Sequence, residues 1–337
     1  MALSNFDGSP HLVTWELTRA CQLHCRHCRA RALRHRDSRE LSAREVEEVL
    51  DSMRDFGRPP VLILTGGDPL ERADLADIIK MAVSRGYPVA LAPSVTPRLT
   101  EDVLVEWADL GVGAVSLSLD GVTPAVHDGF RGVPGTHART EAMARAVVSS
   151  GLRLQINTTV STFTEAELTA MGEYLPSLGV SSWEVFFIIP TGRAAAGPTW
   201  DGARQDRVLS WLADYRRKAA FRVTAVGAPQ FVRYGGQTLS PDRPPVIREA
   251  RGMLFINHVG DVYPSGYLPL SAGNVRERSV VDLYRNTDLF QGLRDPSRLQ
   301  GRCGACAWKA VCGGSRARAY GITGDAWAED PNCLLDA

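Results

Sequence analysis

The sequence predicts an α/β protein, an open (β/α)6 partial barrel followed by a smaller C-terminal unit. Between residues 12 and 190, six short β-rich runs alternate with amphipathic helical stretches, and this pattern indicates a parallel sheet with right-handed crossovers. Six strands are too few for a closed eight-stranded barrel. The seven cysteines form an N-terminal group of three and a C-terminal group of four, which predicts two separate sites.

The strands and helices of the barrel can be located from their periodicity. The expected strands are residues 12–17, 61–64, 88–91, 114–119, 154–157 and 183–189. The expected helices are residues 43–56, 72–85, 100–109, 137–150 and 164–176. Ser42 and Glu45 have the spacing of a capping box, and Gly57 suits the end of the same helix.

Three segments are expected along the chain. Residues 1–195 form the barrel, residues 196–250 contain a helix near 201–219 and a proline-rich linker at 240–245, and residues 251–337 form the second unit. Within that unit we expect a strand at 253–256, a hairpin turn at Gly260-Asp261 and a helix at 279–294.

Composition limits the classes of partner. The chain has 337 residues, with 38 basic and 38 acidic side chains, so no net field selects nucleic acid or an anionic membrane. No apolar stretch approaches the ~18–20 residues of a membrane span, and the N-terminus has no signal-peptide pattern. We therefore expect a soluble cytoplasmic protein. Because thiols stay reduced there, seven cysteines favour metal sites over disulfides.

The N-terminal cysteines lie in one short loop after the first strand. Cys21, Cys25 and Cys28 can hold three corners of an iron–sulfur cube and leave the fourth iron without a protein ligand. An open metal position is typical of a catalytic site. Two alternatives stay open for this triplet alone, a zinc site completed by His24 or His27 and a set of disulfide partners.

Polar and glycine motifs follow the next strands, at the end of a barrel where active sites gather. Thr65-Gly66-Gly67-Asp68-Pro69 follows the second strand, although such a sequence is also good turn chemistry. Strand alternation places Ser116, Ser118 and Asp120 on one face, where they bind a ligand or pair with one another.

The C-terminal group has the spacing of a second metal site. Cys303, Cys306, Cys312 and Cys333 can close a cluster completely. Structural zinc also takes four cysteines, but the five-residue gap and the long return to Cys333 are poor zinc-ribbon spacing. Three plus four ligands use every cysteine, so no thiol is left for other chemistry.

The C-x3-C-x2-C triplet followed by Gly-Gly-Asp-Pro resembles the radical S-adenosylmethionine (SAM) superfamily. The resemblance implies a (β/α)6 core, a [4Fe–4S] cluster whose open iron chelates SAM, and cleavage of SAM to a 5′-deoxyadenosyl radical. Gly66-Gly67-Asp68 is similar to the family's Gly-Gly-Glu motif, and His27 stands where an aromatic residue packs on adenine. The residues implied to bind SAM are His27, Gly66, Gly67, Asp68, Ser94, Ser116, Ser118, Asp120, Arg131 and Asn157.

The C-terminal region resembles the SPASM/twitch extension of the same superfamily. This resemblance implies one auxiliary [4Fe–4S] cluster on the four C-terminal cysteines, because Ser265 and Arg316 stand where a full SPASM domain has further cysteines. Residues 263–276 and 312–320 are similar to a subgroup of alternative haem-synthesis enzymes, which decarboxylate tetrapyrrole propionates, and to natural-product enzymes acting on sugars and nucleosides.

The leading hypothesis is dehydration, decarboxylation or dehydrogenation of a small polar metabolite of the sugar or nucleoside uronate type. Without a spare thiol, epimerisation would need hydrogen donation from Tyr263 or Tyr267. The alternatives are tetrapyrrole decarboxylation, peptide maturation, which the short segment before the first strand disfavours, and a non-catalytic electron carrier. A flavodoxin- or ferredoxin-type reductant is expected. Candidate substrate contacts are Arg193, Tyr234, His258, Tyr263 and Tyr267.

Overall fold

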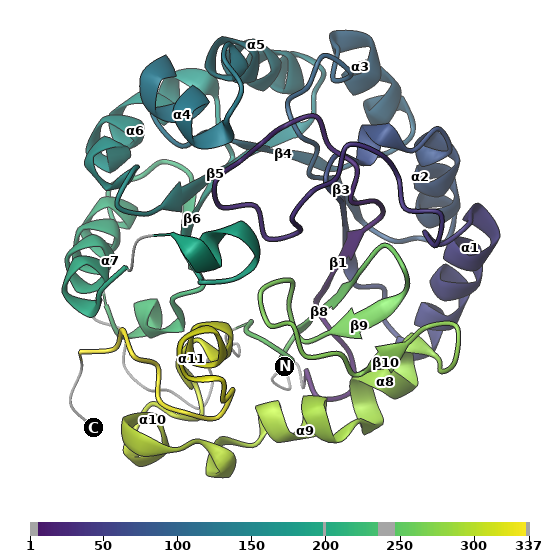
Figure 1. Ribbon diagram of the computed structural model, residues 1–337. Coiled ribbons are helices and arrows are strands. Elements are labelled where there is room, and N and C mark those ends of the chain that lie inside the picture. The colour runs from purple at the N-terminus through teal and green to yellow at the C-terminus, as the bar shows by residue number, and fades with distance from the viewer. Residues whose placement is uncertain (1–5, 198–199, 235–246, 335–337) are drawn as a thin grey trace.

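The computed structural model describes residues 6–197, 200–234 and 247–334. Its core is one curved sheet with the strand order β10-β9-β8-β1-β2-β3-β4-β5-β6-β7 (Figure 1). Strands β8 and β1 to β7 run parallel to one another, whereas β9 runs antiparallel to β8. These strands are Leu12–Glu16 (β1), Val61–Thr65 (β2), Val89–Leu91 (β3), Ala114–Ser118 (β4), Arg153–Val160 (β5), Ser182–Phe187 (β6), Arg222–Val226 (β7) and Met253–Ile256 (β8).

The fold class is confirmed, and two parallel strands extend the predicted six. Strand β7 lies in the segment for which only a helix and a linker were expected. Its signal is weak because only Val223 of its five residues is buried. Strand β8, expected to begin a separate unit, pairs with β1 and so continues the barrel sheet. Within the described residues β7 and β8 do not pair, so the barrel stays open between them.

Helices surround the sheet on its outer side (Figure 1). They are Ala43–Ser52 (α1), Leu75–Ser84 (α2), Glu101–Asp109 (α3), Pro124–Arg131 (α4), Thr136–Ser149 (α5), Leu168–Tyr174 (α6) and Gly202–Arg216 (α7). Both hydrogen bonds of the Ser42–Glu45 capping box are present, and Gly57 has the left-handed conformation that ends this stretch. Helix α4 was not predicted. It begins with Pro124 after the N-cap Thr123 and brings Arg131 to its last position.

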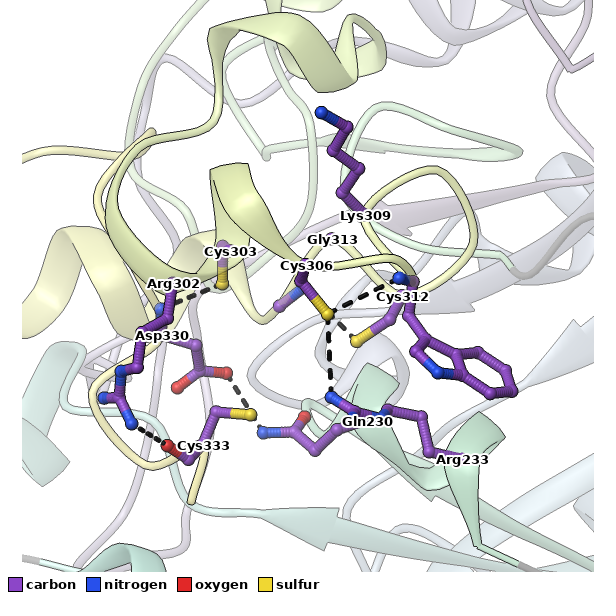
Figure 2. Close-up of a pocket in the computed structure, with 12 residues that line it drawn as sticks. Gln230, Arg233, Arg302, Cys303, Cys306, Lys309, Cys312, Gly313, Asp330 and Cys333 are labelled. Carbon is purple, nitrogen blue, oxygen red and sulfur yellow. Dashed lines mark hydrogen bonds between the residues drawn. The ribbon is translucent and has the colours of Figure 1, made fainter. Parts of the chain in front are cut away.

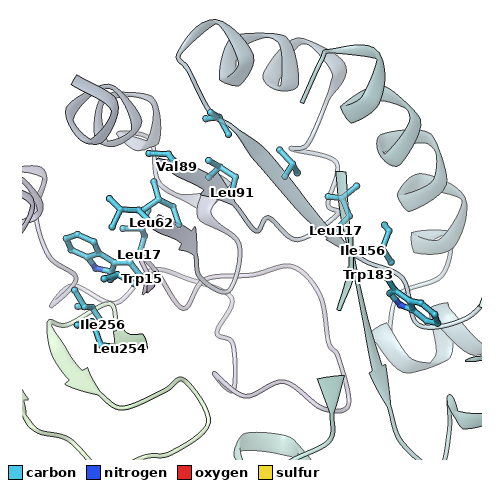
Figure 3. Packing of buried hydrophobic residues seen from close by; sticks show 14 of the residues in the cluster. Trp15, Leu17, Leu62, Val89, Leu91, Leu117, Ile156, Trp183, Leu254 and Ile256 are labelled. Atoms are coloured by element: carbon cyan, nitrogen blue, oxygen red, sulfur yellow. The ribbon is translucent and has the colours of Figure 1, made fainter. Parts of the chain in front are cut away.

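Strand alternation separates an apolar outer face from a polar inner face. Leu117, Ile156 and Trp183 are fully buried between the strands and the surrounding helices (Figure 3). Their neighbours along the strands, including Asn157 and Glu184, are only half-buried and face the inside of the barrel. The interior of the barrel is therefore lined by side chains that can bind a ligand.

The C-terminal region adds a hairpin and four short helices. These elements are Asp261–Tyr263 (β9), Gly273–Asn274 (β10), Val280–Asn286 (α8), Asp288–Arg294 (α9), Gly301–Ala305 (α10) and Arg316–Thr323 (α11). The predicted turn at Gly260 is confirmed between β8 and β9, and its φ of 92° suits glycine. The helix predicted at 279–294 is divided at Thr287, which has extended backbone. The predicted linker at 240–245 lies outside the described residues.

Within the described part of the chain, none of the helices combines the length and the apolar character required to cross a bilayer.

Candidate active site and auxiliary cysteine site

The loop that carries the first three cysteines crosses the end of the barrel at which the parallel strands finish (Figure 1). It spans residues 17–41 between β1 and α1. The backbone N–H of Arg26 donates to the Phe130 carbonyl oxygen at 3.0 Å, which ties the loop to the end of α4. The N–H of Arg193 donates to the Cys28 carbonyl oxygen at 3.0 Å, which ties it to the segment after β6. The loop is thus fixed from both sides of the barrel.

The three cysteines pack together and each sulfur has a donor. Cys21 and Cys25 are buried and Cys28 is half-buried. The donors nearest the sulfurs are the N–H of Leu23 at 3.3 Å for Cys21, Arg131 Nη1 at 3.8 Å for Cys25 and the N–H of Ala32 at 3.5 Å for Cys28. Burial raises the pKa of the Cys21 thiol to about 11, so a stable thiolate here needs a bound cation. Three thiols, two of them buried and one half-buried, with donors on their sulfurs fit an iron–sulfur cluster.

The Gly-Gly-Asp turn seats the cysteine loop. The N–H groups of Gly67 and Asp68 donate to the carbonyl oxygens of Thr18 and Ala20, both at 2.7 Å. A Cβ on Gly67 would lie 2.3 Å from the Ala20 oxygen, and one on Gly66 would lie 2.7 Å from the Thr18 oxygen. These glycines are therefore required because the cysteine loop lies directly against them. Their expected approach to SAM stays a prediction.

Asp68 and Ser94 form hydrogen bonds below Cys21. The fully buried Asp68 carboxylate accepts from Thr96 Oγ1 at 2.8 Å, and burial raises its pKa to about 6. Ser94 Oγ donates to the Gly67 carbonyl oxygen at 2.7 Å and lies 3.3 Å from Cys21 Sγ. Both side chains stabilise the turn beneath the cysteine loop, and Ser94 also reaches a predicted iron ligand.

Asp120 and Arg131, both predicted to bind SAM, pair with one another. Arg131 Nε donates to Asp120 Oδ2 at 2.7 Å, and Asp120 also accepts the Thr159 N–H at 2.8 Å. Burial lowers the pKa of Arg131, but the charges of Asp120 and Cys25 outweigh it and raise the pKa, so Arg131 stays protonated. The pair therefore places a neutralised guanidinium beside the sulfur of Cys25.

His27 stacks on Phe130, with ring centroids 4.2 Å apart and planes within 8°. Burial lowers its pKa to about 3, so the ring is neutral and suits stacking. His24, in contrast, is exposed.

A polar row crosses the inner face of the barrel. Ser118, Asn157, Glu184 and Thr224 lie opposite one another on β4 to β7. Sequence reasoning missed Glu184, although the outward positions of Trp183 and Val185 on either side of it indicate that it faces inward. Burial raises the pKa of Glu184, and no hydrogen bond to its carboxyl group is found among the described residues. An acid in this position is available to a ligand.

Two other predicted SAM contacts on this face have partners within the protein. Ser116 Oγ donates to the Leu91 carbonyl oxygen at 3.4 Å, and Asn157 Oδ1 accepts from Gln155 Nε2 at 2.8 Å. Neither bond uses the full hydrogen-bonding capacity of the side chain, so both stay predicted contacts of SAM.

Of the predicted substrate contacts, Tyr267 lies in the barrel interior. Its ring packs against Phe186 at 6.4 Å. Burial raises the pKa of Tyr267, Arg29 lowers it, and the charges of Glu184 and Cys28 raise it further, so the hydroxyl lies within electrostatic reach of all three. Tyr267 thus lies between the cysteine loop and the unpaired acid.

The other four substrate candidates have partners elsewhere. Arg193 Nε donates to the Cys25 carbonyl oxygen at 2.8 Å, and Tyr234 bonds to Asp206 outside the inner face. Tyr263 donates to Asp261 at 3.4 Å, and burial with that carboxylate raises its pKa to about 12.

The fourth, His258, belongs to a buried ionic network beneath the cysteine loop. His258 Nδ1 lies 3.0 Å from Glu16 Oε1, and Arg29 Nη1 lies 3.0 Å from Glu16 Oε2. Burial raises the pKa of Glu16, but Arg29 and His258 outweigh it and lower the pKa. Because Arg29 also stacks over Phe255 at 4.4 Å, the network joins β1, β8 and the cysteine loop.

The four C-terminal cysteines line a single pocket (Figure 2). Cys303 Sγ accepts from the N–H of Asp330 at 3.4 Å and from Arg316 Nη2 at 3.6 Å. Cys306 Sγ accepts from the N–H of Trp308 at 3.4 Å and from Arg233 Nη1 at 3.7 Å. Cys312 Sγ accepts from the N–H of Gly314 at 3.4 Å. Burial raises the pKa of Cys312 to about 12, so this site also needs a cation to hold thiolates. The donor set fits a fully ligated cluster.

A parallel barrel with a three-cysteine loop across the ends of its strands defines an iron–sulfur enzyme that binds SAM. Residues 15–175 match the family model described as the radical SAM superfamily. The chain is 35% identical over 340 residues to the AdoMet-dependent heme synthase of Methanosarcina barkeri, covering 97% of both. The chain therefore belongs to the radical SAM superfamily, and it uses SAM and a [4Fe–4S] cluster.

Two further similarities concern its closer relatives and its fold. The chain is 31% identical to the pre-heme d1 synthase of Dinoroseobacter shibae, over 98% of this chain and 88% of that one. The crystal structure of Streptococcus suis SuiB bound to S-adenosylmethionine has a TM-score of 0.80 at 17% identity, covering 97% of this chain and 78% of that chain. The first places the chain among SPASM/twitch-containing groups, and the second shows the fold. A non-catalytic role as an electron carrier is thereby set aside.

Proposed function

We propose that this enzyme removes carboxylate groups oxidatively from propionate side chains of a tetrapyrrole. The similarity to the heme synthase, which spans 97% of both chains, carries this proposal, and the pre-heme d1 synthase supports it. Tetrapyrrole decarboxylation was an alternative in the sequence analysis. It replaces the leading hypothesis of a sugar or nucleoside uronate, because these relatives give no support to such a substrate.

The described residues have separate roles in this function. When bound, the cluster on Cys21, Cys25 and Cys28 and the SAM beside it supply the 5′-deoxyadenosyl radical. Gly66 and Gly67 set the distance between the cysteine loop and the barrel, because the backbone of the loop packs directly against them. The remaining predicted SAM contacts surround this loop, where they orient the cofactor.

The reaction balances without a net electron. One hydrogen atom moves from the propionate carbon next to the ring to the 5′ carbon of the adenosyl group. The carbon–carbon bond to the carboxylate then breaks, carbon dioxide leaves, a vinyl group forms and one electron is released. Propionate and SAM thus become vinyl, carbon dioxide, methionine and 5′-deoxyadenosine. The electron that starts cleavage comes from a flavodoxin- or ferredoxin-type protein, and the electron released with carbon dioxide returns to the oxidised form of that protein.

The inner face of the barrel supports a large flat substrate. Phe186 and Tyr267 are half-buried there, and their rings pack at 6.4 Å. Aromatic faces provide apolar surface and stacking for a macrocycle, whereas a sugar is better held by many polar groups. The peptide-maturase alternative is not needed to explain these rings.

The test compares substrates with the anaerobically reconstituted enzyme. Reduced enzyme and SAM are incubated with coproporphyrin, with and without iron, with a nucleoside uronate, or with no substrate. We expect 5′-deoxyadenosine to form fastest with a coproporphyrin and its product to have lost carbon dioxide by mass spectrometry. Stimulation by the nucleoside alone would overturn the proposal. Cys28→Ala serves as the control for background cleavage.

We also propose that Cys303, Cys306, Cys312 and Cys333 hold one auxiliary [4Fe–4S] cluster. Their common pocket and the donors on three of their sulfurs support it. Reconstituted protein should contain about eight irons per chain, four per cluster, and about four after Cys303→Ala and Cys306→Ala are combined. An unchanged iron content in the double variant would contradict this assignment.

A further inference from the structure

The geometry points to Arg233, Arg248 and Arg316 as the residues that raise the reduction potential of the auxiliary cluster. The inference rests on the proposed four-cysteine cluster and concerns residues that do not ligate it. Hydrogen bonds to cluster sulfurs and nearby charge are the means by which proteins set such potentials. Each arginine lies beside a different part of the C-terminal cysteine site.

Arg316 is fixed beside Cys303. Its side chain is fully buried, and Nη1 donates to the backbone oxygens of Ala326 at 2.9 Å and Ala328 at 2.7 Å. Nη2 lies 3.6 Å from Cys303 Sγ. Backbone oxygens hold the guanidinium without cancelling its charge, so a full positive charge lies against this sulfur.

Arg233 reaches the second cysteine from another part of the chain. It ends the short helix Pro229–Arg233 after β7, and its Nη1 lies 3.7 Å from Cys306 Sγ (Figure 2). Its guanidinium also lies over the Trp308 ring at 5.8 Å, which holds the side chain towards the pocket.

Arg248 packs behind the third cysteine. It is 3% exposed, and among the residues that the structure describes none of its three guanidinium nitrogens has a hydrogen-bond partner. Its Nη1 lies 2.4 Å from the position that a Cβ on Gly313 would take, directly after Cys312. Burial lowers the pKa of Arg248 to about 10, so the group is still charged at neutral pH. A buried cation without an acceptor requires an anion nearby.

No carboxylate forms an ion pair with any of the three arginines within the described residues. Two buried acids lie near the site. Asp330 lies 3.2 Å from Arg318 Nη1 and accepts from Gln230 at 3.2 Å, and Glu249, whose charge acts on Arg248, accepts the Ala317 N–H at 3.3 Å. A cluster held by four thiolates is an anion and gains a further negative charge on reduction. Three guanidiniums without an ion-pair partner therefore favour its reduced form, which is equivalent to a higher potential.

The test is a redox titration followed by electron paramagnetic resonance. The full chain with Cys21, Cys25 and Cys28 changed to alanine shows only the auxiliary signal. In this background Arg233→Gln should shift the ratio of reduced to oxidised cluster at least tenfold towards oxidised, a fall in midpoint potential of about 59 mV. Arg316→Gln and Arg248→Gln should shift it in the same direction.

The matched control is Arg302→Gln. Arg302 lines the same pocket, but its side chain is 43% exposed and pairs with the exposed Glu329 at 3.0 Å, so solvent screens its charge from the cysteines. We expect its potential to stay at the parent value. Arg233→Lys, which keeps the charge, should recover part of the loss. Because Arg316 supports buried backbone, Arg233→Gln carries the test if the Arg316 variant does not fold.

The two proposals fail in different ways. If the chain without its N-terminal cysteines binds no iron, the auxiliary cluster itself is refuted. If it binds about four irons per chain and the Arg233 and Arg248 variants keep the parent potential, only the role of the arginines is refuted.

Discussion

The two cysteine sites of this protein differ in whether the arginines beside their sulfurs are paired with a carboxylate. At the N-terminal loop, Arg131 is the arginine that reaches a sulfur among the described residues, and it pairs with Asp120 at 2.7 Å. At the C-terminal pocket, Arg316 and Arg233 reach sulfurs without any carboxylate partner in the described residues. The difference teaches what each site is built for. An open site must accept a ligand that brings its own charges, whereas a closed site can use fixed positive charge to stabilise an added electron.

The largest expected effect separates the two sites by function. Cys28→Ala removes a ligand of the open cluster, so 5′-deoxyadenosine formation should fall below detection. Cys306→Ala affects the other site and should leave slow abortive cleavage of SAM. Both rates are measured by chromatography of anaerobic reactions. If Cys28→Ala still forms 5′-deoxyadenosine, the assignment of the open site is wrong.

The next effect is on the ion pair beside Cys25. Asp120→Asn leaves the guanidinium of Arg131 buried without its carboxylate, which should cost about 3–5 kcal/mol in the free energy of unfolding. Asp330→Asn, which breaks the pair with Arg318 at the other site, is the matched variant. Urea denaturation measures both. Asp120→Asn should also make the N-terminal cluster easier to reduce, and an unchanged potential would contradict the role given to Asp120.

A pH effect of about 3 kcal/mol is expected from Asp68, whose pKa of about 6 lies above its ordinary value of 3.8. Because the folded pKa is raised, the protonated acid favours folding. This contribution is complete below pH 3.8 and is lost as the pH rises through 6. Asp68→Asn should flatten the stability profile between pH 4 and 6 in urea titrations. A profile that keeps the wild-type slope would rule out Asp68 as its source.

The smallest expected effect concerns the packing of the N-terminal cysteine loop against the Gly66-Gly67 turn. Gly67→Ala places a methyl group 2.3 Å from the Ala20 backbone oxygen, so we expect a loss of about 1–3 kcal/mol of stability and reduced iron at the N-terminal site alone. The control Gly129→Ala lies in an exposed helical position with nothing within 4 Å, and it should be neutral or slightly stabilising. Iron analysis and thermal unfolding distinguish the two.

Local patterns in the sequence predicted much of the fold and the two groups of cysteines. Cysteine spacing, strand alternation and the Ser42–Glu45 capping box depend on neighbours along the chain, so they can be read without a structure. Strand β7 escaped because, as an edge strand with one buried residue, it has little apolar pattern. Glu184 was missed although alternation places it on the face opposite Trp183 and Val185, because only the barrel shows which residues share that face.

Only the tertiary structure decided how charge is distributed around the two sites. Arg233, Arg248 and Arg316 are separated by up to 83 positions in sequence, yet each lies beside the same group of cysteines. Likewise, only the tertiary structure shows that the cysteine loop lies on Gly66 and Gly67, which the sequence predicted to approach a ligand. Burial and pairing of charges depend on contacts between distant segments, so the sequence names the ligands of a cluster while the fold sets their electrostatic surroundings.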